Sequence, residues 1–248
     1  MEPARSALVL GASGHIGGAI ASELAKRGWR LGLHACLHPE RCPAAPPGAS
    51  APPPLVYQAD LRNLAEAEKL AADFLRDFGR LEALVWAAGL TRDAPAAVQP
   101  EAQLREVLAL DLTAPFVLAR AFVRQFLKQR AGAALFMASH AGLSGRAGGA
   151  AYAMAQSGLL ALVRSLAREW GPSGLRVNAL IPPFLPDSGL GRAVSPGCAA
   201  ELSRRNVLKS QASSAETVKA VASLAVEVLD NPSVSGQVLV SDGRIAAG

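Results

Sequence analysis

Short apolar runs alternate with helical repeats along the entire chain, and this alternation limits the folds open to it more than any other feature. In the first such unit, the strand-like run 7–10 is followed by Ile16, Ile20 and Leu24, which recur every four residues on one helix face. The alternation predicts βαβ units and a parallel sheet covered by helices on both faces. The predicted strands are 7–10, 29–34, 55–57, 81–86, 133–138, 175–181 and 237–240, and the helices after the first are 64–78, 102–110, 114–130, 152–169 and 214–229.

Length and composition fit one globular domain. The chain has 248 residues, of which 50% are apolar and 18% are charged, and single α/β domains reach this length, so we expect one domain over 1–248. No apolar run approaches the ~20 residues of a membrane span, and the run 7–10 leaves no room for a signal peptide. Cys36, Cys42 and Cys198 are an odd number without metal-like spacing. We therefore expect no disulfide framework, no metal site and a cytoplasmic location.

The basic residues are scattered rather than grouped. The formal charge is +5, and only five of the 25 basic residues are lysines. Acidic residues lie between them and only 5% of residues are aromatic, whereas nucleic-acid binders concentrate charge and offer stacking platforms. We therefore expect no nucleic-acid or membrane partner, and instead an acidic small molecule or an acidic carrier protein.

Two segments interrupt the alternation. Residues 39–54 hold seven of the chain's 17 prolines, a density that excludes an α-helix and predicts a loop of polyproline character. Residues 182–213 contain four prolines and several glycines directly after a predicted strand. Open α/β sheets bind ligands at the carboxyl ends of their strands, so 182–213 is a candidate substrate lid. The alternative is a long surface connection.

Three glycines join the first predicted strand to the first predicted helix. Segment 11–17 reads Gly-Ala-Ser-Gly-His-Ile-Gly, and glycines at this spacing allow a tight turn and a close approach of the backbone to a pyrophosphate at a helix N-terminus. The segment predicts a dinucleotide site. The residues expected to contact the dinucleotide are Gly11, Ser13, Gly14, His15, Ile16 and Gly17.

Further motifs along the chain resemble the short-chain dehydrogenase/reductase family, closest in pattern to its 3-oxoacyl-[acyl-carrier-protein] reductases. Ser139 and Tyr152 are 13 residues apart, the spacing of that family's catalytic pair. The other matching segments, which follow in order over nearly the whole chain, are 11–17, 60–61, 87–93, 165–169, 176–179, 182–184 and 235–237. The resemblance implies a doubly wound Rossmann-type α/β domain that binds NAD(H) or NADP(H) and moves a hydride to or from a carbonyl carbon.

The resemblance also implies roles for individual residues. Tyr152 is the expected general acid and Ser139 the expected partner of the substrate oxygen. A hydride added to a carbonyl requires a proton on the oxygen, which a tyrosine beside a serine can deliver. The further cofactor contacts implied are Asp60 and Leu61 at the adenine, Ala88 and Gly89 at the ribose, and Pro182 and Phe184 at the nicotinamide.

The sequence departs from the family pattern at two positions of the proton relay. Gln156 stands four residues after Tyr152, where the family has a lysine, and Asp111 stands where it has an asparagine. An amide can replace the hydrogen bonds of the lysine to the nicotinamide ribose. It cannot replace the charge that lowers the tyrosine pKa from its usual value near ~10. Gln156 and Asp111 are therefore predicted members of an altered catalytic site.

Two nearby residues could supply the missing cation. His140 follows Ser139 directly, and Arg146 precedes Tyr152 in the same connecting segment. A histidine there would titrate near neutrality. As a neighbour at the end of a strand, however, His140 is expected to point away from Ser139. The alternative for both His140 and Arg146 is an exposed loop residue.

Cofactor choice and partners follow partly from the residues and partly from the resemblance. Segment 34–38 contains no acid to hold a ribose 2′-hydroxyl, which favours NADP(H) over NAD(H), with His38 or Arg41 as phosphate contacts. Arg120, Arg124 and Lys128 recur every four residues, with Arg130 close by, and form either a solvated helix face or a docking site for an acidic acyl carrier protein. The resemblance implies a homodimer or homotetramer.

Two functions remain open from the sequence. The first is an NADP(H)-linked reductase that acts on a ketone such as a 3-oxoacyl thioester, with Ser139 and Tyr152 as its catalytic pair. The second is a catalytically impaired homologue that serves as a non-catalytic subunit of an active reductase. Intact Ser139 and Tyr152 favour the first, and Gln156 favours the second.

Overall fold

Seven strands form one parallel sheet in the order β3-β2-β1-β4-β5-β6-β7. The computed structural model describes residues 4–48, 51–208 and 212–244. The order runs outward from β1 in one direction and then from β4 in the other, so the predicted doubly wound, Rossmann-type α/β fold is confirmed. The strands are Ser6–Leu10 (β1), Arg30–Ala35 (β2), Leu55–Gln58 (β3), Ala83–Trp86 (β4), Gly132–Met137 (β5), Leu175–Ile181 (β6) and Val238–Val240 (β7).

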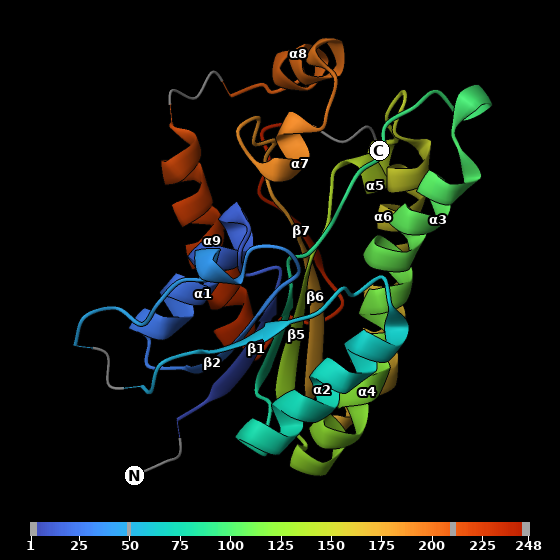
Figure 1. Ribbon diagram of the computed structural model, residues 1–248. Helices are drawn as coiled ribbons and strands as arrows, with labels where there is room; N and C mark the ends of the chain where they lie inside the picture. Colours follow the sequence, from blue (N-terminus) through green and yellow to red (C-terminus); the bar gives the residue numbers. More distant parts are fainter. Residues whose placement is uncertain (1–3, 49–50, 209–211, 245–248) are drawn as a thin grey trace.

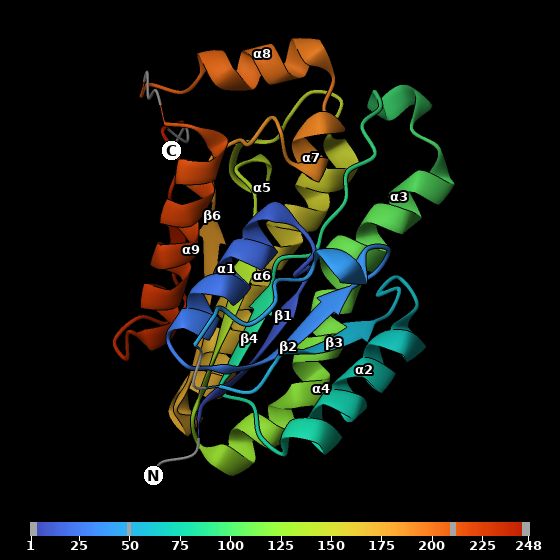
Figure 2. The same ribbon diagram turned by 60° about the vertical axis from the view of Figure 1, so that its left-hand side comes forward.

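Helices cover both faces of the sheet (Figure 1). Helices α1 and α9 pack together on one face, and α2, α4 and α6 lie on the other. The short α5, α7 and the longer α8 lie beyond the carboxyl ends of the strands (Figure 2). The helices are His15–Lys26 (α1), Leu64–Phe78 (α2), Glu101–Leu108 (α3), Ala114–Gln129 (α4), Ala141–Ser144 (α5), Ala150–Trp170 (α6), Gly189–Arg192 (α7), Pro196–Arg204 (α8) and Ser214–Asp230 (α9).

Apolar side chains fill the space between the sheet and each helical layer. On the α2 side, Phe74 is 0% exposed, stacks on Phe78 with ring centroids 4.3 Å apart, and meets Phe122 edge-on at 5.9 Å. On the α1 side, Ile20 and Leu24 are fully buried, as the four-residue repeat in the sequence predicts. This packing fixes the sheet, and the carboxyl ends of its strands form the edge at which ligands bind in open α/β folds.

The structure adds detail in three segments that the sequence left irregular. A π-helical turn at Ala109–Thr113 joins α3 to α4, so the predicted helices 102–110 and 114–130 form one continuous stretch. The segment 182–213 contains α7 and α8 rather than a plain connection. The proline-rich segment 39–54 holds one 3-10 turn, Pro39–Arg41, and no α-helix among its described residues. Residues 49–50 and 209–211 of these segments lie outside the described residues.

Within the described ranges, none of the helices combines the length and the apolar character that crossing a membrane would take. All three cysteines are free thiols.

Phe74 provides a test of the core on the α2 side. Phe74→Ala removes a ring with no exposed surface, so we expect a loss of about 3–5 kcal/mol in the free energy of unfolding, measured with urea. Leu37→Ala is the control, because Leu37 is 77% exposed and its loss should change the value by no more than about 0.5 kcal/mol. Equal losses for the two variants would contradict this account of the core.

Candidate active site

The turn between β1 and α1 is built by backbone contacts that leave no room for side chains. Gly11 has φ +78°, and a Cβ on it would lie 2.6 Å from the amide nitrogen of Ala88. A Cβ on Gly17 would lie 2.3 Å from the carbonyl oxygen of Gly11. Gly14 is the N-cap of α1 and contributes no side-chain cap, so the first-turn N–H groups of α1 stay open to an anionic ligand.

His34 at the end of β2 holds this turn in place. Its Nδ1 accepts the N–H of Gly11 at 3.2 Å, and its Nε2 donates to the carbonyl oxygen of Ala59 at 3.0 Å. These two partners require the neutral ring with its proton on Nε2. His34 is 2% exposed, and its burial lowers its pKa. His34 was not predicted to be a site residue, although its place at the end of the second predicted strand was a visible signal.

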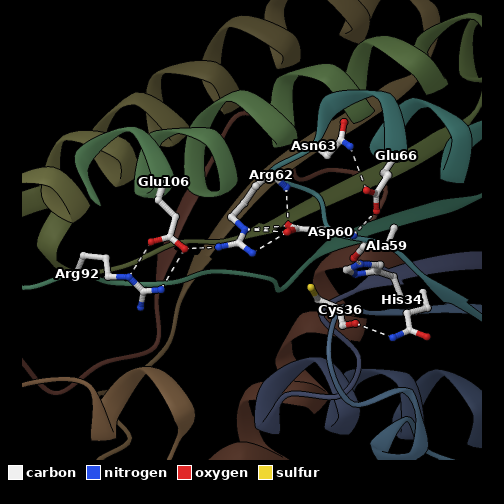
Figure 3. Close-up of polar contacts among 10 residues, drawn as sticks. His34, Cys36, Ala59, Asp60, Arg62, Asn63, Glu66, Arg92 and Glu106 are labelled. Atoms are coloured by element: carbon white, nitrogen blue, oxygen red, sulfur yellow. Dashed lines mark hydrogen bonds and ion pairs between the residues drawn. The ribbon is translucent and has the colours of Figure 1, made fainter. Parts of the chain in front are cut away.

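A chain of ion pairs lies beyond the end of β3, where the adenine contact is predicted (Figure 3). The carboxylate of Asp60 accepts hydrogen bonds from the backbone N–H of Arg62 at 3.0 Å and from its guanidinium, whose Nη2 lies at 2.6 Å. Arg62 also forms an ion pair with Glu106. The Oε2 of Glu106 in turn lies 2.8 Å from the Nε of Arg92. Leu61 is 1% exposed and packs into the core, so its side chain points away from this edge.

Ser139, Tyr152 and Gln156 line one pocket at the carboxyl edge of the sheet. The pocket is open to solvent on one side. An adjoining pocket is lined by Gly14, His15 and other residues of the α1 N-terminus. Predicted cofactor contacts that line either pocket are Gly14, His15, Ile16, Gly17, Ala88, Gly89, Pro182 and Phe184. Ser13, Asp60, Leu61 and Asp111 line neither, and Gly11 shapes the turn from behind.

The surroundings of Tyr152 favour a protonated hydroxyl. Burial raises its pKa, and Asp111 would raise it further only in its ionised form. The hydrogen bond from Ser139 and the charge of Arg146 act in the opposite direction without reversing the shift. The Oγ of Ser139 also accepts the N–H of Ala141 at 3.2 Å, which fixes the serine at the start of α5. The group at the centre of the pocket is therefore a proton donor rather than a base.

Asp111 lies on the π-helical turn and is 0% exposed. Burial raises the pKa of its carboxyl well above the usual value, while the N–H of Leu90, 3.2 Å from Oδ1, acts the other way. A Cβ on Gly89 would lie 3.0 Å from the same oxygen, so a larger residue there would crowd the Asp111 carboxyl. Low solvent access thus favours the protonated carboxylic acid at Asp111.

Gln156 carries the clearest sign of a missing ligand. The residue is 4% exposed, lines the Tyr152 pocket, and its Oε1 has no hydrogen-bond partner among the described residues. Buried polar atoms are almost always paired. A donor such as a ribose hydroxyl would satisfy this oxygen, so the pocket and the uncapped N-terminus of α1 fit a bound dinucleotide.

His140 and Arg146 correct two expectations from the sequence. Neither is an exposed loop residue, and both line the pocket of Tyr152, so His140 does not point away from the site. His140 is 3% exposed and its Nδ1 lies 3.0 Å from the hydroxyl of Ser144. Burial and the nearby arginines lower its pKa, so it is not the missing cation. The side chain of Arg146 is 8% exposed. Of the two residues predicted to supply the missing cation, Arg146 is the one that does carry a charge in this pocket.

Known proteins resemble this chain over most of its length. A sequence model of the family described as enoyl-(acyl carrier protein) reductase matches residues 11–243. The 3-oxoacyl-[acyl-carrier-protein] reductase of Staphylococcus aureus is 32% identical over 187 residues, which cover 75% of this chain and 76% of the relative. The protein of the same description from Bos taurus is 29% identical over 96% of both chains.

Two solved structures are similar over almost the whole chain. A dehydrogenase/reductase from Sinorhizobium meliloti has a TM-score of 0.81 and 28% identity, covering 96% of this chain and 94% of its own. A protein from Beutenbergia cavernae, described as a candidate NAD(P)-dependent gluconate 5-dehydrogenase with bound NADP, has a TM-score of 0.83, 32% identity, and coverage of 96% and 95%. Fold and relatives define an oxidoreductase of the Rossmann type. The chain belongs to the short-chain dehydrogenase/reductase family.

His34 predicts a pH-dependent stability. Its folded-state pKa is lowered by burial, so its contribution is complete above the unfolded value near ~6.5 and is lost as the pH falls through the folded value. His34→Gln keeps an acceptor for Gly11 and a donor for Ala59 but does not titrate. Between pH 7 and pH 5, urea unfolding should therefore show the native protein losing stability relative to His34→Gln. Parallel curves for the two proteins would disprove the assignment.

Proposed function

We propose that this protein is an NADP(H)-linked oxidoreductase that reduces a ketone, with Tyr152 and Ser139 as its catalytic pair. The observation that carries the proposal is their common pocket at the carboxyl edge of the sheet, in which the Ser139 side chain bonds to the Tyr152 hydroxyl. The adjoining glycine turn and the unpartnered Oε1 of Gln156 support a dinucleotide beside them.

In this proposal the glycine turn holds the cofactor phosphates at the N-terminus of α1, and Gln156 accepts a hydrogen bond from a ribose hydroxyl. Pro182 and Phe184 line the same pocket and limit the access of water to it. When bound, the dinucleotide would supply a hydride for the carbonyl carbon. The chain itself then has to supply a proton and to stabilise the charge on the oxygen.

Tyr152 delivers that proton. Its raised pKa keeps the proton on the hydroxyl until negative charge develops on the substrate oxygen, which as an alkoxide is a much stronger base than a tyrosinate. The Oγ of Ser139 accepts the backbone N–H of Ala141, and its own O–H can turn from the Tyr152 hydroxyl to donate to the substrate oxygen. The pair thus suits reduction better than the reverse oxidation, which needs the tyrosinate.

Two sources of positive potential take the place of the lysine that the family pattern predicts at Gln156. Tyr152 is the third residue of α6 and lies at the positive end of its helix dipole. The guanidinium of Arg146 lies against Gly149 just before this helix, because a Cβ on Gly149 would lie 2.8 Å from the Arg146 Nε. The charge of Arg146 lowers the pKa of Tyr152 and so opposes part of the effect of burial.

A protonated Asp111 can also replace the asparagine of the family pattern. An asparagine side chain offers one acceptor and one donor group, and a neutral carboxylic acid offers the same pair. One oxygen of Asp111 accepts the N–H of Leu90 at 3.2 Å, which leaves an O–H to donate. The substitution thus keeps the hydrogen-bonding functions of the position.

The residues after β2 support NADP(H) as the cofactor. Segment 36–38 contains no carboxylate to bind a ribose 2′-hydroxyl or to repel a 2′-phosphate. The next acid along the chain is Glu40, whose Oε1 lies 3.0 Å from the His38 Nδ1 and 4.0 Å from the Arg41 Nε. A phosphate would compete with Glu40 for these two side chains. The similar structure from Beutenbergia cavernae holds NADP.

The names of the relatives make a 3-oxoacyl thioester on an acyl carrier the first substrate to test. A docking site for an acidic carrier would use the basic residues of α4 and its end. Arg120 is already paired with Glu68 at 2.8 Å, whereas Arg124, Lys128 and Arg130 form no ion pair with described residues. These three cations are the proposed contacts.

We also propose that α4 and α6 form the interface of a homodimer or homotetramer, or of a pair with an active reductase. Three large apolar side chains on these helices are 42–50% exposed, namely Phe116, Leu127 and Met154. Burial of such side chains is the usual driving force of association.

Tyr152→Phe tests the catalytic pair. It removes the proton donor, so we expect NADPH oxidation with a short 3-oxoacyl thioester to fall by about 10²- to 10⁴-fold while NADPH binding is retained. Tyr57→Phe is the matched control, because Tyr57 lies on β3 and bonds Asp77 at 2.9 Å. Unchanged turnover in Tyr152→Phe would refute the assignment. Cofactor binding without any turnover in the native protein would favour the non-catalytic alternative.

The pH dependence of the two directions is a separate test. Because the pKa of Tyr152 is raised, ketone reduction should stay nearly constant from pH 6 to 9, and oxidation of the alcohol should increase about 10-fold per pH unit. Gln156→Lys adds a cation and should move the oxidation limb to lower pH, whereas the uncharged Gln156→Met should not. Reduction that declines between pH 7 and 9 would show that Tyr152 already titrates there.

A further inference from the structure

Three arginines line the pocket that contains Ser139 and Tyr152. They are Arg146, Arg205 and Arg244, which come from the segment before α6, the end of α8 and the segment after β7. No aspartate or glutamate lines this pocket within residues 4–48, 51–208 and 212–244. The wall that surrounds the proposed catalytic pair therefore presents positive groups to a ligand and no negative ones.

Two of these arginines already have carboxylate partners behind the wall. The Nη2 of Arg146 lies 2.7 Å from Asp93, and the Nε of Arg244 lies 2.8 Å from Asp242. Their side chains are only 8% and 7% exposed, so both pairs are parts of the folded structure. Arg205, by contrast, is exposed and forms no ion pair with any described carboxylate. One positive charge is thus left over at the pocket.

The backbone fixes the place of Arg205. Arg205 is the C-cap of α8, and the next residue, Asn206, pairs with Arg244 in an antiparallel bridge. The N–H of Val207 donates to the carbonyl oxygen of Gly243 at 2.9 Å. A Cβ on Gly243 would lie 2.1 Å from the Asn206 Oδ1, so the two segments are in close contact. These contacts between residues 206–207 and 243–244 hold the end of α8 beside the pocket.

The pKa of His140 shows that the charges of Arg205 and Arg244 reach the wall of this pocket. His140 lines the pocket and is 3% exposed. Burial lowers its pKa first, and the charges of Arg244 and Arg205 lower it further. The imidazole of His140 is therefore a neutral part of the pocket wall. The positive potential in the pocket comes from the guanidinium groups of the three arginines.

We propose that the ketone substrate carries a carboxylate and that Arg205 binds it. The inference rests on the proposed reductase activity. It favours small oxo acids and their hydroxy-acid products over the carrier-bound thioester that the names of the relatives suggest. A guanidinium binds a carboxylate through two parallel N–H···O bonds, which fixes orientation as well as charge. A neutral thioester offers the arginine no such partner. The carbonyl to be reduced then lies on the Ser139 and Tyr152 side of the pocket.

The test compares 3-oxobutanoate, its methyl ester and its N-acetylcysteamine thioester as substrates with NADPH. The native protein should prefer the acid, and Arg205→Gln should reduce the ratio of kcat/KM for acid over ester by about 10- to 100-fold, mainly through KM. Arg205→Lys should keep part of the ratio. Arg204→Gln is the matched control, because Arg204 is paired with Glu201, is 77% exposed and does not line the pocket.

The outcomes separate this inference from the proposed function. An ester or thioester preferred by the native protein, or equal effects of Arg204→Gln and Arg205→Gln, would overturn the inference and leave the reductase standing. Absence of turnover with all three compounds would count against the reductase. In that case the inference is tested by binding: the melting temperature of the NADPH-loaded protein is measured with and without 3-hydroxybutanoate. The inference expects a shift in the native protein that is lost in Arg205→Gln, and no shift in the native protein would overturn it.

Discussion

The close approach of two backbone segments at the β1–α1 turn sets the geometry of the whole binding edge. Gly11 contacts the backbone of Ala87 and Ala88 so tightly that a Cβ would lie 2.6–2.7 Å from their atoms. This contact places the N-terminus of α1 beside the end of β4, and His34 ties the same turn to β2. The first-turn amides of α1 and the pocket around Tyr152 adjoin each other because Ala87, Gly89 and Thr91, which follow β4, line both sites.

Burial then decides the chemistry at that edge. Burial raises the pKa of Asp111, which has no exposed surface, and that of Tyr152, which lines the pocket. Arg146 opposes the shift of Tyr152 but is bound to Asp93, so its charge is shared. As a result, Tyr152 is a proton donor, Asp111 is a neutral carboxylic acid, and Arg205 is the one pocket arginine without a carboxylate partner among the described residues. These features fit reduction of an anionic ketone better than oxidation of an alcohol.

Several elements could be predicted because their signals are local. The strands follow from short apolar runs, α1 from its four-residue repeat, and the turn at 11–17 from its glycines. The π-helical turn at 109–113 could not, since it depends on the burial of Asp111 against the Leu90 segment. His140 was likewise expected to point away from Ser139, because nothing in segment 139–146 indicates that residues of α8 and residues after β7 line the same pocket.

The sequence by itself determined the doubly wound fold, the glycine turn, the spacing of Ser139 and Tyr152, and the replacement at Gln156. Only the tertiary structure decided which charges are paired and which is left over. Arg146 and Asp93 are 53 residues apart in the chain, yet form a buried pair. Periodic patterns in the sequence indicate whether a residue faces the core. The distance between two charged side chains and the exclusion of water from them depend on segments that meet only after folding.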